Sequence, residues 1–261
     1  MDTMDQKLKE LLERVLRDTR PLFEAAATHD TKFINVLLGI YRISFVTIRD
    51  IYYLSSHEDA GASALDLTRK IIEYGIAVEY MIMKDKEKMA ERFQKYIWVQ
   101  AQNEIEFLKS IGQDPSTLSE EFKSGVVEIQ KEFNSLDEEI KNSNMWAGAR
   151  VGARKMLKDL YEAKTLGDFD FSRLGRAYVW GCLLNHPNPF VVRGYLSQDD
   201  QKVADEFYLR QAMLMAILMH LRLTTRYIDE ISSLSKQDMY QDLADKVSAV
   251  YKGIDALGQL K

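Results

Sequence analysis

Cysteine is almost absent from this 261-residue chain, which contains only Cys182. A single cysteine excludes an internal disulfide and any zinc site built from several cysteines. Cys182 lies in the apolar run Tyr178–Leu184, where a free thiol packs as a small hydrophobic side chain. We therefore predict a packed thiol, in a chain long enough to build its core without disulfides or metal.

Proline and glycine are also scarce, with 4 and 13 residues. So few turn-forming residues argue against a β-sandwich, barrel or propeller, each of which needs many turns. Hydrophobic residues make up 46% of the chain and charged residues 29%, which is the usual mixture of a globular protein. This composition excludes a disordered or collagen-like chain.

A long hydrophobic run is missing as well. The most apolar stretch, Ala212–Leu221, is bracketed by Arg210 and Arg222 and is about half the ~20 residues that a membrane-spanning helix needs. The N-terminal residues Met1–Lys7 are charged and lack the apolar segment of a secretory signal. We expect no membrane association and a cytoplasmic location.

Sequence motifs for common cofactor and metal chemistry are absent too. The chain has no glycine-rich phosphate loop, no H-E-x-x-H, no G-x-S-x-G and no Glu-x-x-His pair. Its four histidines, at positions 29, 57, 186 and 220, are widely dispersed. We therefore predict no metal and no cofactor. The net charge of −5 does not indicate a nucleic-acid partner, although it leaves a local basic patch open.

Helical spacing of apolar residues dominates the chain, and strict alternation is rare. We predict an all-α protein: a single bundle-like domain over residues 1–261, with eight or nine long helices, short loops and 116–141 as a protruding arm. Pro21 is expected to end or restart the first helix. The expected helices cover 5–18, 30–55, 61–83, 86–110, 116–141, 147–163, 171–184, 198–233 and 237–256.

Two charged residues, Arg69 and Glu73, fall on or beside the apolar stripe of the helix over 61–83. A buried arginine needs a partner, and Glu73 lies one turn away at i+4. Two interpretations stay open. The pair is a structural ion pair that fixes helix packing, or it lines a polar cleft.

Helix 198–233 is apolar on all sides around His220, which predicts a central helix with a hydrogen-bonded core histidine. Arg222 and Arg226 follow at i,i+4 spacing. They either hold an anion or pair with Asp229 and Glu230.

The segment Asn185–Pro189 carries two prolines, which stiffen it, and it presents His186 at the end of an apolar helix. Histidine titrates near neutral pH and serves as an acid, a base or a ligand. The alternative is a structural histidine that interacts favourably with the helix dipole.

Several short motifs together resemble a widespread bacterial family of helical proteins catalogued as a domain of unknown function, over residues 60–190. In order they are Arg69-x-x-x-Glu73, the charged turn Lys84–Glu87, the segment Ala90–Tyr96, Trp146 and His186–Pro187.

This family is loosely similar to abortive-infection and HEPN-type helical proteins, some of which are ribonucleases. The resemblance implies a helical fold in which the arginine, glutamate and histidine meet in one pocket. The HEPN pattern places four to six residues between arginine and histidine, whereas nine separate Arg176 from His186 here.

Three functions remain open. The first is a module that binds a protein partner or a small ligand. The second is a HEPN-like, metal-independent ribonuclease or phage-defence effector, which would act on RNA. The third is a structural subunit of a homo-oligomer. The candidate catalytic residues are His186 and Glu73, and the candidate ligand-binding residues are Arg69, Arg92, Tyr96 and Asn185.

Overall fold

The structure is a computed structural model that describes residues 3–25, 29–57, 59–115, 120–143, 145–148, 151–165, 171–184, 198–235 and 241–258. These residues are mostly helical and contain no strand, which confirms the all-α prediction. The helices within them are α1 (Thr3–Ala25), α2 (Lys32–Leu54), α3 (Gly61–Lys84), α4 (Lys86–Ser110), α5 (Glu120–Ser135), α6 (Glu138–Lys141), α7 (Ala153–Glu162), α8 (Phe171–Leu184), α10 (Gln198–Ser235) and α11 (Gln241–Gly258).

Pro21 does not end the first helix, contrary to the prediction, because α1 continues through it to Ala25. The proline lies four residues before the end of the helix and removes only one backbone hydrogen bond there. Beyond it, Leu22 is buried, and the ring of Phe23 stacks on Phe45 of α2 at a centroid distance of 4.4 Å. This packing retains the final turn of α1.

The prediction of one continuous helix over 116–141 is also wrong, because α5 ends at Ser135 and α6 begins at Glu138. Leu136 between them is buried, and its backbone N–H reaches the carbonyl of Phe133 at 3.1 Å. The chain then becomes extended at Asp137 before α6. The change of direction lets Leu136 pack with Ile140 against α4.

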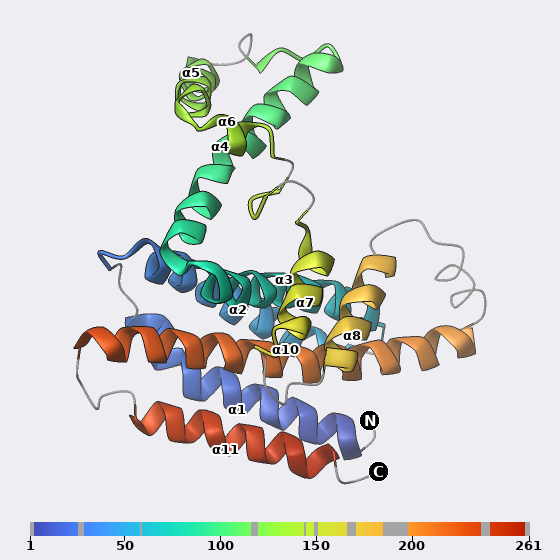
Figure 1. Ribbon diagram of the computed structural model, residues 1–261. Helices are drawn as coiled ribbons and strands as arrows, with labels where there is room; N and C mark the ends of the chain where they lie inside the picture. Colours follow the sequence, from blue (N-terminus) through green and yellow to red (C-terminus); the bar gives the residue numbers. More distant parts are fainter. Residues whose placement is uncertain are drawn as a thin grey trace. The chain divides into compact units, whose positions relative to one another are not determined.

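The chain divides into two compact units, of which the first comprises Met1–Glu79 with Lys164–Lys261 and the second Tyr80–Ala163. In the first unit, α10 contacts α1, α2, α8 and α11 (Figure 1). In the second unit, α4 contacts α5 and α6. The single domain expected from the sequence stays a prediction, and the segment 116–141 belongs to the second unit.

Helix α10 is the central helix of the first unit, as its apolar sequence indicated. Between Tyr208 and Ile231, buried side chains occur all around the helix, because other helices pack on several of its sides. The buried apolar residues of this stretch are Tyr208, Ala212, Met213, Met215, Ala216, Ile217, Met219, Leu221, Leu223, Tyr227, Ile228 and Ile231.

The second unit has a smaller core of its own. Tyr96 and Val99 of α4 pack with Leu136 and Ile140, and Trp98, Phe133 and Trp146 cover this cluster. The indole ring of Trp146 also meets Phe93 edge to face, at a centroid distance of 5.2 Å. These aromatic contacts fasten the segment after α6 to the start of α4.

None of the helices in the described ranges is long and apolar enough to cross a membrane. Among the same residues, no three His, Cys, Asp or Glu side chains are grouped in a way that would hold a metal ion.

Candidate functional site

The ion pair predicted on α3 is present. The Nε–H of Arg69 donates to Oε1 of Glu73 at 2.9 Å, and the two side chains are 23% and 36% exposed. Among the residues that the structure describes, Glu73 is the one hydrogen-bond acceptor for this guanidinium. An arginine has five N–H donors, so most of its hydrogen-bonding capacity remains unused there.

Opposing effects act on the charge of Arg69. Burial lowers its pKa, but the charge of Glu73 and the hydrogen bond to it outweigh burial, so the pKa of Arg69 is raised overall. The side chain is therefore cationic at every physiological pH.

Helix α8 passes very close to Arg69 at Gly181. A Cβ atom added to Gly181 would lie 2.8 Å from the Cβ of Arg69 and 3.3 Å from its Cδ. Only glycine allows the two helices to approach this closely without displacing the arginine stem. The contact positions α8 beside the Arg69–Glu73 pair.

Two polar groups of α8 face this region. Tyr178 is buried, which raises the pKa of its hydroxyl, and a hydrogen bond with Cys182 raises it further. Both residues also interact electrostatically with Arg69. Cys182 is half-buried, so its thiol is less enclosed than the sequence suggested. We call Arg69, Glu73, Tyr178, Gly181 and Cys182 the Arg69 site.

Two of the predicted site residues, His186 and Asn185, lie outside the described residues. They follow directly on α8, which ends at Leu184, one turn beyond Gly181 and Cys182 of the Arg69 site. The expectation that His186 meets Arg69 and Glu73 therefore stays a prediction.

Arg92 belongs to the second unit and holds the segment around α6 in place. Its Nε–H donates to the carbonyl of Trp146 at 2.7 Å, and Nη1 pairs with Glu139 at 2.5 Å. Its remaining nitrogen, Nη2, is buried and finds no acceptor within the described part of the chain. A buried nitrogen meets a ligand from solvent only if its surroundings move, so these contacts favour a structural role.

Tyr96, four residues further along α4, is buried in the apolar cluster of the second unit. Burial raises the pKa of its hydroxyl. Its packing against Val99 and Ile140 also favours a structural role over ligand binding.

A second arginine–glutamate cluster, centred on Glu79 of α3, was not identified from the sequence. Arg222 donates from Nε to Oε1 of Glu79 at 2.6 Å, and Arg226 donates from Nε and Nη2 to Oε1 and Oε2, both at 2.9 Å. Glu79 is 3% exposed, and both its oxygens are occupied. This cluster is therefore a structural ion-pair network in which the arginines occupy both oxygens of the carboxylate.

The sequence contained a signal for Glu79. Fourteen residues after Leu65, it falls within 40° of the centre of the apolar stripe on α3. A glutamate in that position requires a cationic partner. The sequence predicts only an anion or the helix neighbours Asp229 and Glu230 as partners of Arg222 and Arg226. The hydrogen bond with Glu79 is the main cause that raises the pKa of Arg226, and the charges of Asp229 and Glu230 raise it further.

His220 is fully buried and joins three helices, as predicted for a core histidine. Its Nδ1 lies 2.8 Å from the hydroxyl of Ser44 on α2, and its Nε2 lies 3.2 Å from the hydroxyl of Thr19 on α1. Each hydroxyl also donates to a backbone carbonyl at 2.8 Å, Thr19 to Val15 and Ser44 to Tyr41. A neutral imidazole donates at one nitrogen and accepts at the other, so one hydroxyl accepts from the ring while the other shares its single proton between the ring and its carbonyl. Tyr41 stacks on the ring at a centroid distance of 5.4 Å.

Comparison with known proteins assigns the middle of the chain to a protein family. Residues 34–203 match the family model described as a family of unknown function, DUF5677. The chain belongs to DUF5677. This result confirms the resemblance to a domain of unknown function, and the match includes all of the Arg69 site. No curated protein and no solved structure matched this DUF5677 chain.

Proposed function

We propose that this DUF5677 chain is a helical binding module that holds a phosphate-bearing ligand at the Arg69 site. The observation that carries the proposal is the guanidinium of Arg69, whose terminal nitrogens have no acceptor among the residues that the structure describes. On the same helix, Glu79 has both oxygens occupied by arginines, whereas Arg69 forms one hydrogen bond within the described residues.

The role of Glu73 is to orient the guanidinium. Because its carboxylate binds Nε, the two terminal nitrogens of Arg69 keep a fixed plane, which suits the paired oxygens of a phosphate. Glu73 also neutralises the local charge. Affinity therefore depends on the geometry of these hydrogen bonds more than on net charge, which agrees with a chain whose net charge is −5.

The proposal is tested by the binding of a short, fluorescein-labelled single-stranded RNA, measured by anisotropy. Arg69→Gln is expected to raise the dissociation constant at least about tenfold, because hydrogen bonds to charged groups contribute roughly 1.5–3 kcal/mol. The matched control is Arg20→Gln. Arg20 is paired at i+4 with Glu24 by the same Nε–Oε1 contact, at 2.7 Å, but is 69% exposed.

We expect Arg20→Gln to bind the RNA as the unsubstituted protein does, because it removes one positive charge without touching the Arg69 site. Equal weakening by both substitutions would show that only net charge matters and would contradict the proposal. Failure of the unsubstituted protein to bind the RNA would contradict it as well.

A second candidate function is that of a metal-independent ribonuclease of HEPN type. The observation that favours it is the close packing of α8 at Arg69, since His186 follows two residues after that helix ends. In this candidate, His186 acts as the general acid and base, and Arg69 holds the scissile phosphate. A bacterial, cytoplasmic role in phage defence, as the resemblance implies, belongs to the same proposal.

The ribonuclease candidate predicts RNA cleavage by the purified protein in the presence of a metal chelator. Cleavage is expected to be lost in both His186→Ala and Arg69→Gln, and His186→Ala is expected to keep the thermal unfolding midpoint. RNA binding without cleavage would contradict the ribonuclease candidate and would agree with the binding module. A large drop in the unfolding midpoint of His186→Ala would identify His186 as structural.

A further inference from the structure

A cavity of about 310 Å³ lies between the first and last helices of the first unit. It is lined by Lys7, Glu10, Leu11 and Arg14 of α1 and by Gly253 of α11. This volume lies at the lower end of the range of ligand-binding pockets, and the cavity is open to solvent on one side. Both helices lie outside residues 34–203, so the cavity is not part of the family match.

The cavity depends on the glycine at position 253. A Cβ atom added there would lie 3.3 Å from Cδ2 of Leu11, so a larger side chain would have to enter the space between the helices. Leu11 and the bare backbone at Gly253 provide an apolar surface next to the charged groups.

The charged lining is predominantly cationic. Lys7 is exposed and has no ion-pair partner within the described ranges. Arg14 uses only Nε in its contact with Oδ2 of Asp18, at 3.4 Å. Glu10 accepts a hydrogen bond from Gln6 at 2.9 Å.

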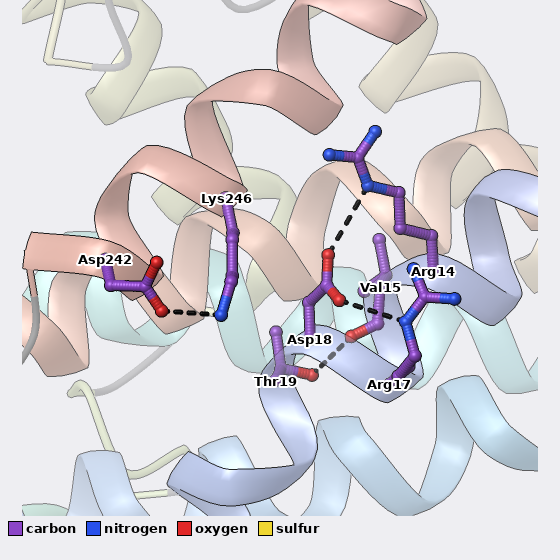
Figure 2. Close-up of polar contacts among 7 residues, drawn as sticks. All are labelled: Arg14, Val15, Arg17, Asp18, Thr19, Asp242 and Lys246. Atoms are coloured by element: carbon purple, nitrogen blue, oxygen red, sulfur yellow. Dashed lines mark hydrogen bonds and ion pairs between the residues drawn. The ribbon is translucent and has the colours of Figure 1, made fainter.

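Asp18 holds Arg14 from outside the cavity. In Figure 2, the guanidiniums of Arg14 and Arg17 approach this carboxylate from two sides, and Arg17 reaches the second oxygen, Oδ1, at 3.2 Å. Asp18 engages Arg14 through Nε alone and steadies the side chain, and within the described ranges the two terminal nitrogens of Arg14 have no partner and remain available to a ligand.

We propose that this cavity binds a small organic anion. Its carboxylate or phosphate group is held by Lys7 and Arg14, and its short apolar tail lies against Leu11 and the backbone at Gly253. This site is separate from the Arg69 site, and the proposal does not depend on the function assigned there.

The test measures binding of three probes with six carbon atoms each by NMR titration of backbone amides. Hexanoate and hexyl phosphate represent the two kinds of anion, and hexylamine carries the opposite charge. At least one anion is expected to bind with a dissociation constant of the order of 1 mM and to shift amides of α1 and α11, while hexylamine does not. The stronger of the two anions identifies the head group that the site prefers.

Three variants locate the binding. Arg14→Gln is expected to weaken the anion at least about tenfold, because it removes charge-assisted hydrogen bonds. Gly253→Leu is expected to abolish binding, because the new side chain fills the cavity. The matched control is Arg17→Gln, which also removes a cationic partner of Asp18. Arg17 does not line the cavity, so this substitution should leave anion binding unchanged.

Equal binding of hexylamine and the anions would overturn the proposal, as would equal weakening by Arg14→Gln and Arg17→Gln. Absence of anion binding by the unsubstituted protein would overturn it too. The side chain of Arg14 is 41% exposed, so its variant remains informative even if Gly253→Leu fails to fold. The variant Arg69→Gln should bind the anions normally, which separates this outcome from that of the proposed function.

Discussion

Lowering the pH from 6.5 to 4.5 is expected to remove about 2 kcal/mol of folding free energy through His220. Burial lowers the pKa of this histidine from 6.5 to about 3. Each pH unit well inside this interval changes the free energy of unfolding by about 1.4 kcal/mol, and the change is smaller within about one unit of either pKa. Small domains are stable by only about 5–15 kcal/mol, so the loss is a large part of the total.

The sign follows from proton binding. Below pH 6.5 the unfolded chain protonates His220, whereas the folded chain keeps it neutral between Ser44 and Thr19 until the pH approaches 3. The unfolded state therefore binds more protons, and stability falls as the pH falls. The contribution of neutral His220 is fully present above pH 6.5.

This prediction is checked by urea unfolding at several pH values between 7 and 4.5. Carboxylates begin to titrate at the lower end of this range, so the comparison needs a variant that retains all of them. The control is His220→Gln, whose amide offers one donor and one acceptor to the same two hydroxyls but does not ionise. We expect the substituted protein to show a much smaller loss over this range. The same pH dependence in both proteins would contradict the assignment.

Replacing Glu79 by alanine is expected to destabilise the first unit by about 3 kcal/mol. Removing one partner of a buried ion pair costs roughly 3–5 kcal/mol, because the remaining charge is left without compensation. We expect the lower end because Arg222 and Arg226 are still 19% and 30% exposed and regain some hydration.

The measurement is chemical unfolding at neutral pH, with Glu73→Ala as the matched control on the same helix. Glu73 is 36% exposed and carries a single arginine, so its removal should cost about 1 kcal/mol or less. Equal effects of the two substitutions would contradict the distinction between a saturated structural pair and an open site.

Acid conditions provide a further check on Glu79. Burial raises its pKa, but the hydrogen bonds from Arg226 and Arg222 outweigh this effect, so the pKa lies below the ordinary value of 4.5. A lowered pKa means that the contribution of Glu79 is present above pH 4.5 and is lost as the pH falls through the folded-state value. The loss of stability from protonation of Glu79 therefore begins near pH 4.5, at the lower end of the pH range used for His220.

Local patterns predicted most of the helices, because apolar spacing alone determines them. The expected ranges 30–55, 61–83, 86–110 and 171–184 agree with α2, α3, α4 and α8 to within two residues. Pro21 was misjudged because its cost depends on position in the helix and is offset by tertiary packing of Leu22. The break between α5 and α6 likewise follows from packing in the second unit.

At the candidate site, too, local patterns predict contacts within one helix but not contacts between helices. The Arg69–Glu73 contact was predictable because both residues lie on one helix at i,i+4. The partners of Arg222 and Arg226 were not, because Glu79 is 143 residues distant from one and 147 from the other. The close approach of Gly181 to Arg69 likewise depends on the packing of two helices distant in sequence.

The central claim is that the terminal nitrogens of Arg69 hold a phosphate group. The most direct test is NMR of the arginine side-chain N–H groups, with Arg69 assigned through Arg69→Lys, before and after addition of a short single-stranded RNA. We predict that the terminal N–H signals of Arg69 sharpen and shift while its Nε–H, bound to Glu73, stays in place. RNA binding that leaves every Arg69 signal unchanged would contradict the claim.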